Sequence, residues 1–250
     1  MSGSTSGYAV AVENHEQVRV LVLDRPQKLN AFTAEGYRAL AAQLALAAED
    51  RLVSVCVLTG RGRAFSAGVD LNEVNRRGGG AELGAEFDPL LECLARFPKP
   101  LVAAASGPAV GFGATILLHC DLVVVDETAT IRLPFVDLMT CAEAASSWLL
   151  PLRVGPQQAS WMMLSGVPMQ ADEAVATGFA LARVPSGQAL EKALALAQLI
   201  ASHPVDVLVA NKRLLREGYT EHIAAVWQRE KAAMADLAEK LGPLTWPDRA

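Results

Sequence analysis

The sequence AFSAGVD, at residues 64–70, connects a short apolar run to the start of a predicted helix. A second stretch of the same kind, SGPAVGFG at residues 106–113, also follows an apolar run and leads into an apolar helix. Glycine permits the tight backbone that such turns need. Because the N-terminus of a helix exposes unpaired N–H groups, two such turns aimed at one point would form an oxyanion hole. The simpler alternative is a pair of ordinary strand-to-helix turns.

Neither turn has the pattern of a nucleotide-binding loop. No Gly-Lys-Ser or Gly-Lys-Thr follows either one, which argues against a phosphate-binding loop. Gly111 and Gly113 lack the third glycine of the dinucleotide fingerprint and lie far from the first predicted strand. The sequence therefore does not predict a nicotinamide cofactor.

The segments before the two turns predict strands that alternate with helices. Alternating β-branched residues favour a strand at 18–23, and apolar runs favour buried parallel strands at 53–59 and 101–105. Between the first two, Thr33 is the predicted N-cap of a helix that runs to about residue 49. Elements of both kinds therefore follow one another along this part of the chain.

The chain after the first turn continues this pattern and then changes. Asp70 is predicted to cap a helix, GGG at 78–80 is interpreted as a mobile loop, and a helix is expected at 86–97. Further strands are expected at 122–125 and 130–133. Beyond them nearly everything is predicted to be helical, in segments near 143–153, 156–165, 171–177, 187–202, 204–217 and 220–240. This order predicts an α/β core of βαβ units followed by a helical C-terminal region.

Composition excludes several classes of protein. The 250 residues fit one large domain with or without a small appendage, and 52% hydrophobic against 20% charged residues predicts a folded core. The net charge is −5 and no long Lys/Arg block occurs, so no nucleic-acid or anionic-membrane surface is predicted. No uncharged apolar run reaches about 18 residues, so no membrane span is expected. Four widely spaced cysteines predict neither a disulfide framework nor a zinc site, and a cytoplasmic protein is expected.

The two turns, with FPKPLVAA at 97–104 between them, resemble the signature regions of the crotonase (enoyl-CoA hydratase/isomerase) superfamily. The resemblance extends over roughly residues 10–240. Its further matches are DRP followed by NA within 24–31, CDLV at 120–123, LSG at 164–166, the pattern A-x-E-A at 171–174 and GFA at 178–180.

The resemblance implies a fold, an assembly and a class of substrate. Members fold as a spiral of ββα units, so residues 8–190 are expected to form the core. Residues 191–250 are expected to form a C-terminal helical region for trimerisation and for covering the active site. Homotrimers or dimers of trimers are expected. The implied substrate is an acyl-CoA thioester of fatty-acid-type metabolism, with no separate cofactor and no metal.

The resemblance also assigns residues to roles. Two main-chain N–H groups, of Val69 and Phe112, are expected to hold the thioester oxygen, on which charge develops when an α-proton is removed. Each such donor is worth roughly 10²–10³ in rate. Substrate contacts are expected along both turns, and Asp70 is interpreted chiefly as a helix cap. The residues expected to contact substrate are Lys28, Ala67, Gly68, Asp70, Leu71, Asn72, Gly111, Thr115 and Phe135.

The resemblance implies that hydratases of this family use two carboxylates for catalysis, and this chain departs from that pattern. The two glutamate positions hold Thr115 and Phe135, neither of which can activate water as a carboxylate does. Thr115 is expected either to donate a hydrogen bond in the pocket or simply to pack. The departure argues against efficient hydration of an enoyl-CoA.

The stretch PFVDLMTCAEAASS at 134–147 resembles the corresponding part of Δ3,Δ2-enoyl-CoA isomerases, where a glutamate at the position of Glu143 is the sole acid/base. Apolar neighbours, Phe135, Leu138 and Trp148, are expected to raise its pKa. As a first-turn residue of a helix, Glu143 would instead have its pKa lowered by the dipole, and the sequence does not rank the two effects. Asp137 is the alternative base.

An enoyl-CoA isomerase is therefore the leading hypothesis. Another reaction of the superfamily, such as hydration or thioester hydrolysis, is the second. The third is a non-catalytic acyl-CoA-binding protein that kept the fold and lost the chemistry. His119, next to Cys120 at an apolar helix end, is expected to be structural.

Overall fold

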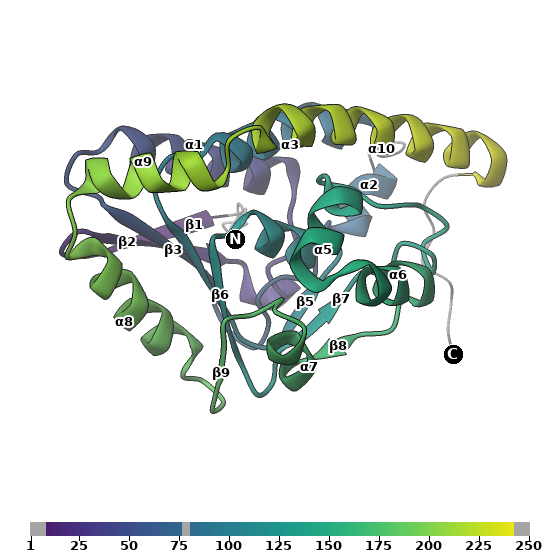
Figure 1. Ribbon diagram of the computed structural model, residues 1–250. Coiled ribbons are helices and arrows are strands. Elements are labelled where there is room, and N and C mark those ends of the chain that lie inside the picture. The colour runs from purple at the N-terminus through teal and green to yellow at the C-terminus, as the bar shows by residue number, and fades with distance from the viewer. Residues whose placement is uncertain (1–8, 77–80, 243–250) are drawn as a thin grey trace, which may run out of the picture.

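The computed structural model describes residues 9–76 and 81–242, and a six-stranded sheet forms its centre (Figure 1). The first strand runs antiparallel to the second, and all other neighbours are parallel. In spatial order the strands are β1 (Ala9–His15), β2 (Val18–Asp24), β3 (Val55–Gly60), β4 (Leu101–Ala105), β6 (Leu122–Asp126) and β9 (Ala182–Val184).

A second, three-stranded sheet lies beside the first and has the order β5 (Pro108–Val110), β7 (Thr130–Arg132) and β8 (Met169–Gln170). The chain passes from the large sheet to the small one at β4–β5 and again at β6–β7, and returns from β8 to β9. Successive turns of the chain thus add a strand to each sheet. The observed fold is the predicted α/β spiral with a helical C-terminal region.

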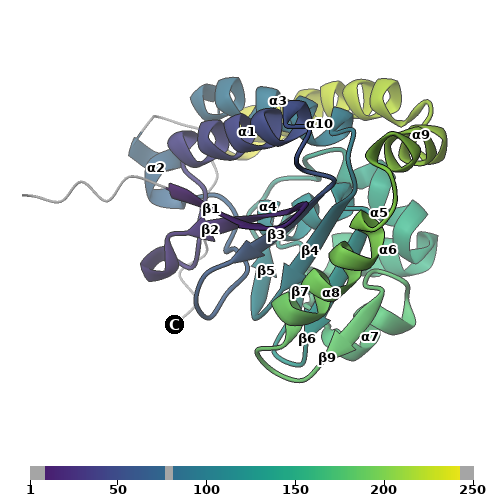
Figure 2. The same cartoon turned by 90° about the vertical axis from the view of Figure 1, so that its left-hand side faces the viewer.

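Helices fill the connections between the strands. The early ones are η1 (Pro26–Lys28), α1 (Ala34–Glu49), α2 (Leu71–Arg76), α3 (Ala81–Arg96), α4 (Phe112–Thr115) and the 3-10 helix η2 (Ile116–His119). The later ones are α5 (Ser146–Val154), α6 (Pro156–Ser165), α7 (Ala171–Ala176), α8 (Ala189–Ala201), α9 (Val205–Leu215) and α10 (Tyr219–Leu241). Figure 2 shows α1, α3 and α10 along the same side of the molecule.

Both faces of the inner strands β2, β3, β4 and β6 are buried, as near-continuous apolar strands require. The valines of β2 and β3 that point to one face pack against the buried alanines of α8, which lies along that face (Figure 1). The residues that alternate with them, including Leu21 and Leu58, belong to the larger core under α1 and α3. Thus α8, placed by prediction near the start of a separate C-terminal region, completes the core of the sheet.

Most of the predicted elements match the structure. Thr33 accepts a hydrogen bond from the N–H of Gly36 at 3.2 Å and caps α1, as predicted. The strand at 101–105 and the helix at 156–165 have the predicted bounds. The loop predicted at 78–80 lies outside the described residues. Cys56 and Cys120 are buried free thiols, as expected, and burial raises the pKa of each to about 12.

Two predictions of local structure were wrong. The chain beyond residue 143 is nearly all helical, as predicted, but the short strands β8 and β9 in it return to the two sheets. The glycine-rich turn contains the strand β5, and α3 begins at Ala81 and includes Pro89. Strands of two or three residues are too short to show an alternating pattern, so pairing with neighbours defines them.

Among the described residues no single helix is long and apolar enough to cross a membrane. The pair α8 and α9, bent by 106°, passes that test by length and composition only.

The side chain of Asn30 fastens the chain that leads into the first glycine turn. Asn30 is fully buried, with a left-handed φ of 56°. Its Nδ2 donates to the carbonyl oxygens of Arg61, Ala64 and Phe65 at 3.0, 2.9 and 3.2 Å. Its Oδ1 accepts from the N–H of Arg25 at 3.0 Å. One amide therefore joins the end of β2 to the approach of the turn.

Replacement of Asn30 by alanine is expected to lower the free energy of unfolding by about 3 kcal/mol, because buried carbonyls lose their donor. Urea unfolding followed by circular dichroism measures the change. Asn211→Ala, on the exposed side of α9, is the matched control and is expected to shift stability by about 0.5 kcal/mol at most. Equal stabilities of the two variants would contradict this role.

Candidate active site

The two glycine turns lie against each other. Ser66 and Ala109 form a parallel bridge, in which the N–H of Ser66 donates to the Pro108 carbonyl at 3.2 Å and the N–H of Val110 to the Ser66 carbonyl at 2.9 Å. A Cβ atom on Gly113 would lie only 2.3 Å from the Ser66 oxygen. The two turns, which were expected to converge, are therefore in direct backbone contact.

The backbone around Val69 orients its N–H group. Phe32 donates to the Gly68 carbonyl at 2.6 Å and accepts from the N–H of Asp70 at 2.8 Å. In a parallel bridge the residue between two such partners turns its own N–H to the opposite side. The preceding residue, Gly68, lies against the second turn, because a Cβ on it would lie 2.4 Å from the Val110 oxygen and 3.3 Å from the Phe112 nitrogen.

The N–H of Phe112 is the first of helix α4. Gly111 precedes it with a φ of 53°, and the Gly111 carbonyl accepts from Ala114 and Thr115, each at 2.9 Å. In residues 9–76 and 81–242, neither the Phe112 nor the Val69 main-chain N–H has a hydrogen-bond acceptor. Both N–H groups named by the prediction are thus without a protein acceptor, and their joint role as oxyanion donors stays a prediction.

An aromatic cluster fixes the backbone of the second donor. The Phe112 ring packs edge-on against Phe32, Tyr37 and Phe87, with ring centroids 5.0, 5.5 and 4.8 Å apart. Phe32 is also the residue that bridges Val69. The two donors therefore share one rigid support.

Glu143 is held by a residue of helix α4. Its Oε1 accepts a hydrogen bond from Thr115 Oγ1 at 2.5 Å, and Thr115 ends the helix that Phe112 begins. Of the two roles considered for Thr115, the hydrogen bond is the one observed. It brings the carboxylate expected to act as base to the helix that carries the second donor.

Burial raises the pKa of Glu143 to about 8. The hydrogen bond from Thr115 opposes the rise, and the negative charge of Glu230 adds to it. The residue is half-buried, which leaves part of its surface open, while its carboxyl group is surrounded by protein. The alternative of a first-turn helix residue was wrong, because α5 begins only at Ser146 and desolvation outweighs any effect of its dipole.

Two other candidate residues have structural partners. Asp137 forms an ion pair with Arg132 at 2.8 Å. His119 is fully buried, and its Nε2 lies 2.9 Å from the Ala144 carbonyl, so Nε2 carries the hydrogen. Burial lowers the His119 pKa to about 4, which keeps the ring neutral. The predicted structural role of His119 agrees with these contacts.

Six of the residues expected to contact substrate lie in the first turn or next to it, and Gly111, Thr115 and Phe135 lie elsewhere. Lys28 is exposed next to it, since the following residue, Leu29, accepts from the N–H of Ala67 at 2.8 Å. The Asp70 carboxylate pairs with Arg25 at 2.7 Å and accepts from the N–H of Asn72 at 3.0 Å. Although burial opposes it, the Arg25 guanidinium lowers the pKa of Asp70. These contacts match the cap predicted for Asp70.

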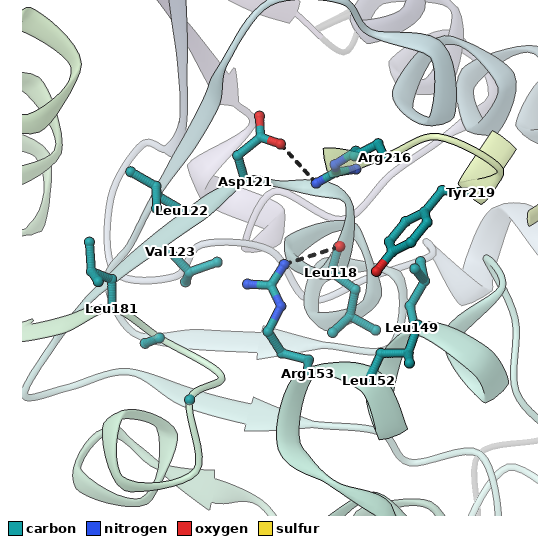
Figure 3. Close-up of a pocket in the computed structure, with 12 residues that line it drawn as sticks. Leu118, Asp121, Leu122, Val123, Leu149, Leu152, Arg153, Leu181, Arg216 and Tyr219 are labelled. Atoms are coloured by element: carbon teal, nitrogen blue, oxygen red, sulfur yellow. Dashed lines mark hydrogen bonds and ion pairs between the residues drawn. The ribbon is translucent and has the colours of Figure 1, made fainter. Parts of the chain in front are cut away.

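Two pockets flank this region. Phe135, buried as expected, lines one of about 350 Å³ together with Cys141 and Ala142, which directly precede Glu143. The other, of about 450 Å³, lies between α5 and the start of α10 (Figure 3). Its Arg153 binds the carbonyls of Leu118 and Cys120, so its polar groups serve the fold. Within the described ranges no group of three His, Cys, Asp or Glu side chains is placed to hold a metal.

Sequence reasoning missed Glu230, which contacts the segment after Glu143 from α10. A signal was present. The buried face of α10 is formed by residues 223, 226, 227 and 230, at helical spacing, and Glu230 is the one charged residue among them. A glutamate at a core position of an amphipathic helix needs hydrogen-bond partners. The sequence could therefore have indicated that Glu230 is buried and partnered, but not which residues bind it.

Comparisons with known proteins identify the family to which this fold belongs. The enoyl-CoA hydratase/isomerase family model matches residues 13–241. The chain is 37% identical to 2,3-dehydroadipyl-CoA hydratase of Escherichia coli (91% of this chain, 89% of the relative). It is 31% identical to human enoyl-CoA delta isomerase 2 (89% and 58%).

Among solved structures, an enoyl-CoA hydratase/isomerase from Pseudoalteromonas atlantica superposes with a TM-score of 0.87. The two chains are 32% identical, over 94% of this chain and 93% of the other. The protein belongs to the enoyl-CoA hydratase/isomerase family of the crotonase superfamily, and the resemblance seen in the sequence is confirmed.

The raised pKa of Glu143 predicts how stability depends on pH. From an ordinary 4.5 to about 8, the folded protein keeps a proton that the unfolded chain releases, so the free energy of unfolding falls as pH rises through this window. Glutamine imitates the neutral acid. Glu143→Gln is therefore expected to be more stable than the wild type at pH 9, on the order of a few kcal/mol, and nearly equal at pH 4.5.

Urea unfolding across this pH range measures the difference. Glu221→Gln, on the exposed side of α10, controls for the loss of a surface carboxylate. Parallel stability curves for the wild type and Glu143→Gln would contradict the buried, raised-pKa carboxyl.

Proposed function

We propose that this protein is a Δ3,Δ2-enoyl-CoA isomerase in which Glu143 is the single acid/base. The observation that carries the proposal is the 2.5 Å hydrogen bond between Thr115 and Glu143. It holds a carboxyl group with a pKa near 8 against the helix whose first N–H is one of two free donors. A base poised near neutral pH is well matched to abstracting and returning a proton.

The reaction needs one base and one oxyanion site. The Glu143 carboxylate takes a proton from C2 of a 3-enoyl-CoA, and the C–H electron pair becomes the C1–C2 double bond of a dienolate. The negative charge goes to the thioester oxygen, where the N–H groups of Val69 and Phe112 stabilise it. Glu143 then gives the proton to C4, where the C3–C4 π pair forms the new C4–H bond. The C1–C2 π pair moves to C2–C3, and an oxygen lone pair reforms the thioester carbonyl. No atom is gained or lost.

Hydration asks for more than this site supplies. The family resemblance implies that hydration uses two glutamates. In this chain Thr115 and the buried Phe135 occupy the positions of those glutamates. Asp137 is ion-paired to Arg132. Since a relative at 37% identity is named a hydratase, hydration is the alternative outcome that the experiment must measure.

The coenzyme A part of the substrate is proposed to pass along the first turn. Ala67, Leu71 and Asn72 follow one another there toward the start of α2, and exposed Lys28 supplies a positive charge beside them. The acyl part then extends past Gly111 toward Phe135.

Glu143→Gln is expected to lower turnover of 3-enoyl-CoA by about 10²–10⁴, because glutamine cannot accept the C2 proton. The assay detects the 2-enoyl-CoA product by coupling it to a hydratase and a dehydrogenase. Exchange of the α-proton in deuterated water is expected to fall in parallel.

Asp137→Asn is the matched control and is expected to keep the exchange rate. Unchanged turnover in Glu143→Gln would remove Glu143 from the mechanism. Rapid hydration of crotonyl-CoA by the wild type would favour the hydratase alternative, and tight acyl-CoA binding without exchange would favour a binding protein.

Gly68→Ala is expected to lower kcat on the order of 10²-fold while the protein stays folded. The new methyl group would meet the Val110 carbonyl at 2.4 Å and push the two donors apart. Gly187→Ala controls for strain, because Gly187 has a similar φ of 81° and an added Cβ there meets nothing within 4 Å. Equal kcat values for the two variants would contradict the role of the turn contact.

A further inference from the structure

Glu230 places a buried carboxylate on the segment that follows Glu143. Only 5% of Glu230 is exposed. Its Oε2 accepts from the N–H of Ala145 at 2.7 Å, and its Oε1 accepts from the N–H and the hydroxyl of Ser147 at 2.9 and 2.6 Å. These residues lie at the start of α5. A residue near the end of the chain thus binds the loop that carries the base.

The bound segment has a costly backbone. Ala144 and Ala145 have φ values of 56° and 59°, a left-handed conformation that costs roughly 1–2 kcal/mol for each residue with a side chain. Such a pair persists only where its surroundings hold it. The His119 ring donates to the Ala144 carbonyl on one side, and Glu230 accepts from Ala145 on the other. These contacts of His119 and Glu230, called the clamp below, therefore begin one residue after Glu143.

The same helix supports the donor side of the site. Trp227 packs on Phe87 with centroids 5.1 Å apart, and Phe87 packs on Phe112 at 4.8 Å. Asp88, next to Phe87, accepts from Trp227 Nε1 at 2.6 Å and pairs with Lys231 at 2.7 Å. Helix α10 thus contacts the loop of the base and, through Phe87, the helix of the second donor.

We propose that Glu230 is a positioning residue, whose carboxylate clamps the left-handed Ala144–Ala145 pair and so keeps Glu143 on Thr115 and beside the two backbone donors. The inference rests on the proposed function for its kinetic consequence. The clamp itself is a statement about the free protein and is measurable without substrate.

Charge gives the clamp a second effect. The Glu230 charge raises the pKa of Glu143 after burial has done so. Burial raises the pKa of Glu230 too, against its hydrogen bonds and the charge of Arg229. Two other titratable groups lie near the loop. Burial and the Glu230 charge raise the pKa of the Cys141 thiol, and His119 is neutral. Removal of the Glu230 charge therefore lowers the pKa of Glu143.

The test is Glu230→Gln, in which an amide faces the N–H donors of Ala145 and Ser147. Carboxyl ¹³C NMR of protein labelled at glutamate Cδ follows the Glu143 titration, and the signal is assigned by its loss in Glu143→Gln. We expect the Glu143 midpoint to fall in Glu230→Gln and its chemical shift to change. Kinetics with 3-enoyl-CoA are expected to show a kcat loss on the order of 10- to 100-fold with little change in KM.

Glu221→Gln, an equal change on the exposed side of the same helix, is expected to leave the Glu143 titration and kcat unchanged. Ser147→Ala keeps the charge of Glu230 and removes one 2.6 Å contact, so it tests the clamp even if Glu230→Gln fails to fold. A smaller kcat loss without a fall in the Glu143 midpoint is expected for it.

An unchanged Glu143 titration in Glu230→Gln, or wild-type kcat in both Glu230→Gln and Ser147→Ala, overturns the inference. A wild-type protein that neither isomerises nor exchanges the α-proton overturns the proposed function alone, because the titration still reports whether Glu230 acts on Glu143.

Discussion

The contact between the two glycine turns is the constraint on which the site depends. Val69 and Phe112 belong to different turns of the spiral, and backbone-to-backbone contact joins the two segments that carry them. The close approach of Gly68 to the Val110 carbonyl and of Gly113 to the Ser66 carbonyl leaves no room for a Cβ atom. The Ser66–Ala109 bridge sets the register of this contact. The two glycine turns therefore meet at the proposed oxyanion site.

The structure concentrates its costs at the same place. A carboxyl group is buried beside a second carboxylate, and two alanines adopt left-handed conformations next to it. Local costs of this kind persist when the surroundings determine them. Here the surroundings are a sheet buried on both faces, an aromatic cluster behind Phe112 and the amide of Asn30. The ordinary core thus sustains an unfavourable but reactive arrangement of a few residues.

The sequence predicted the parts of the site that are local and missed those that join distant segments. Both turns, the cap at Thr33 and the loop of Glu143 were recognisable because each signal lies within a few residues. The sequence could not rank burial against a helix dipole for Glu143, because the start of α5 depends on the left-handed pair before it. The clamp by Glu230 and the three carbonyls bound by Asn30 depend on contacts between remote segments, which a single sequence does not encode as a pattern.

The position of the carboxylate connects the chemistry to the C-terminal helix. A glutamate on the helix after the second turn, where this chain has Thr115, would be fixed by that helix directly. Glu143 instead lies on a loop before α5, where its carbonyl accepts from the N–H of Ser146 at 2.9 Å and its carboxyl group depends on side-chain contacts. Thr115 donates a hydrogen bond to the Glu143 carboxylate, and Glu230 on α10 binds the residues that follow Glu143. If Glu143 is the base, as proposed, its place on a loop and not on a helix makes its geometry depend on α10, because Glu230 binds the residues that follow it.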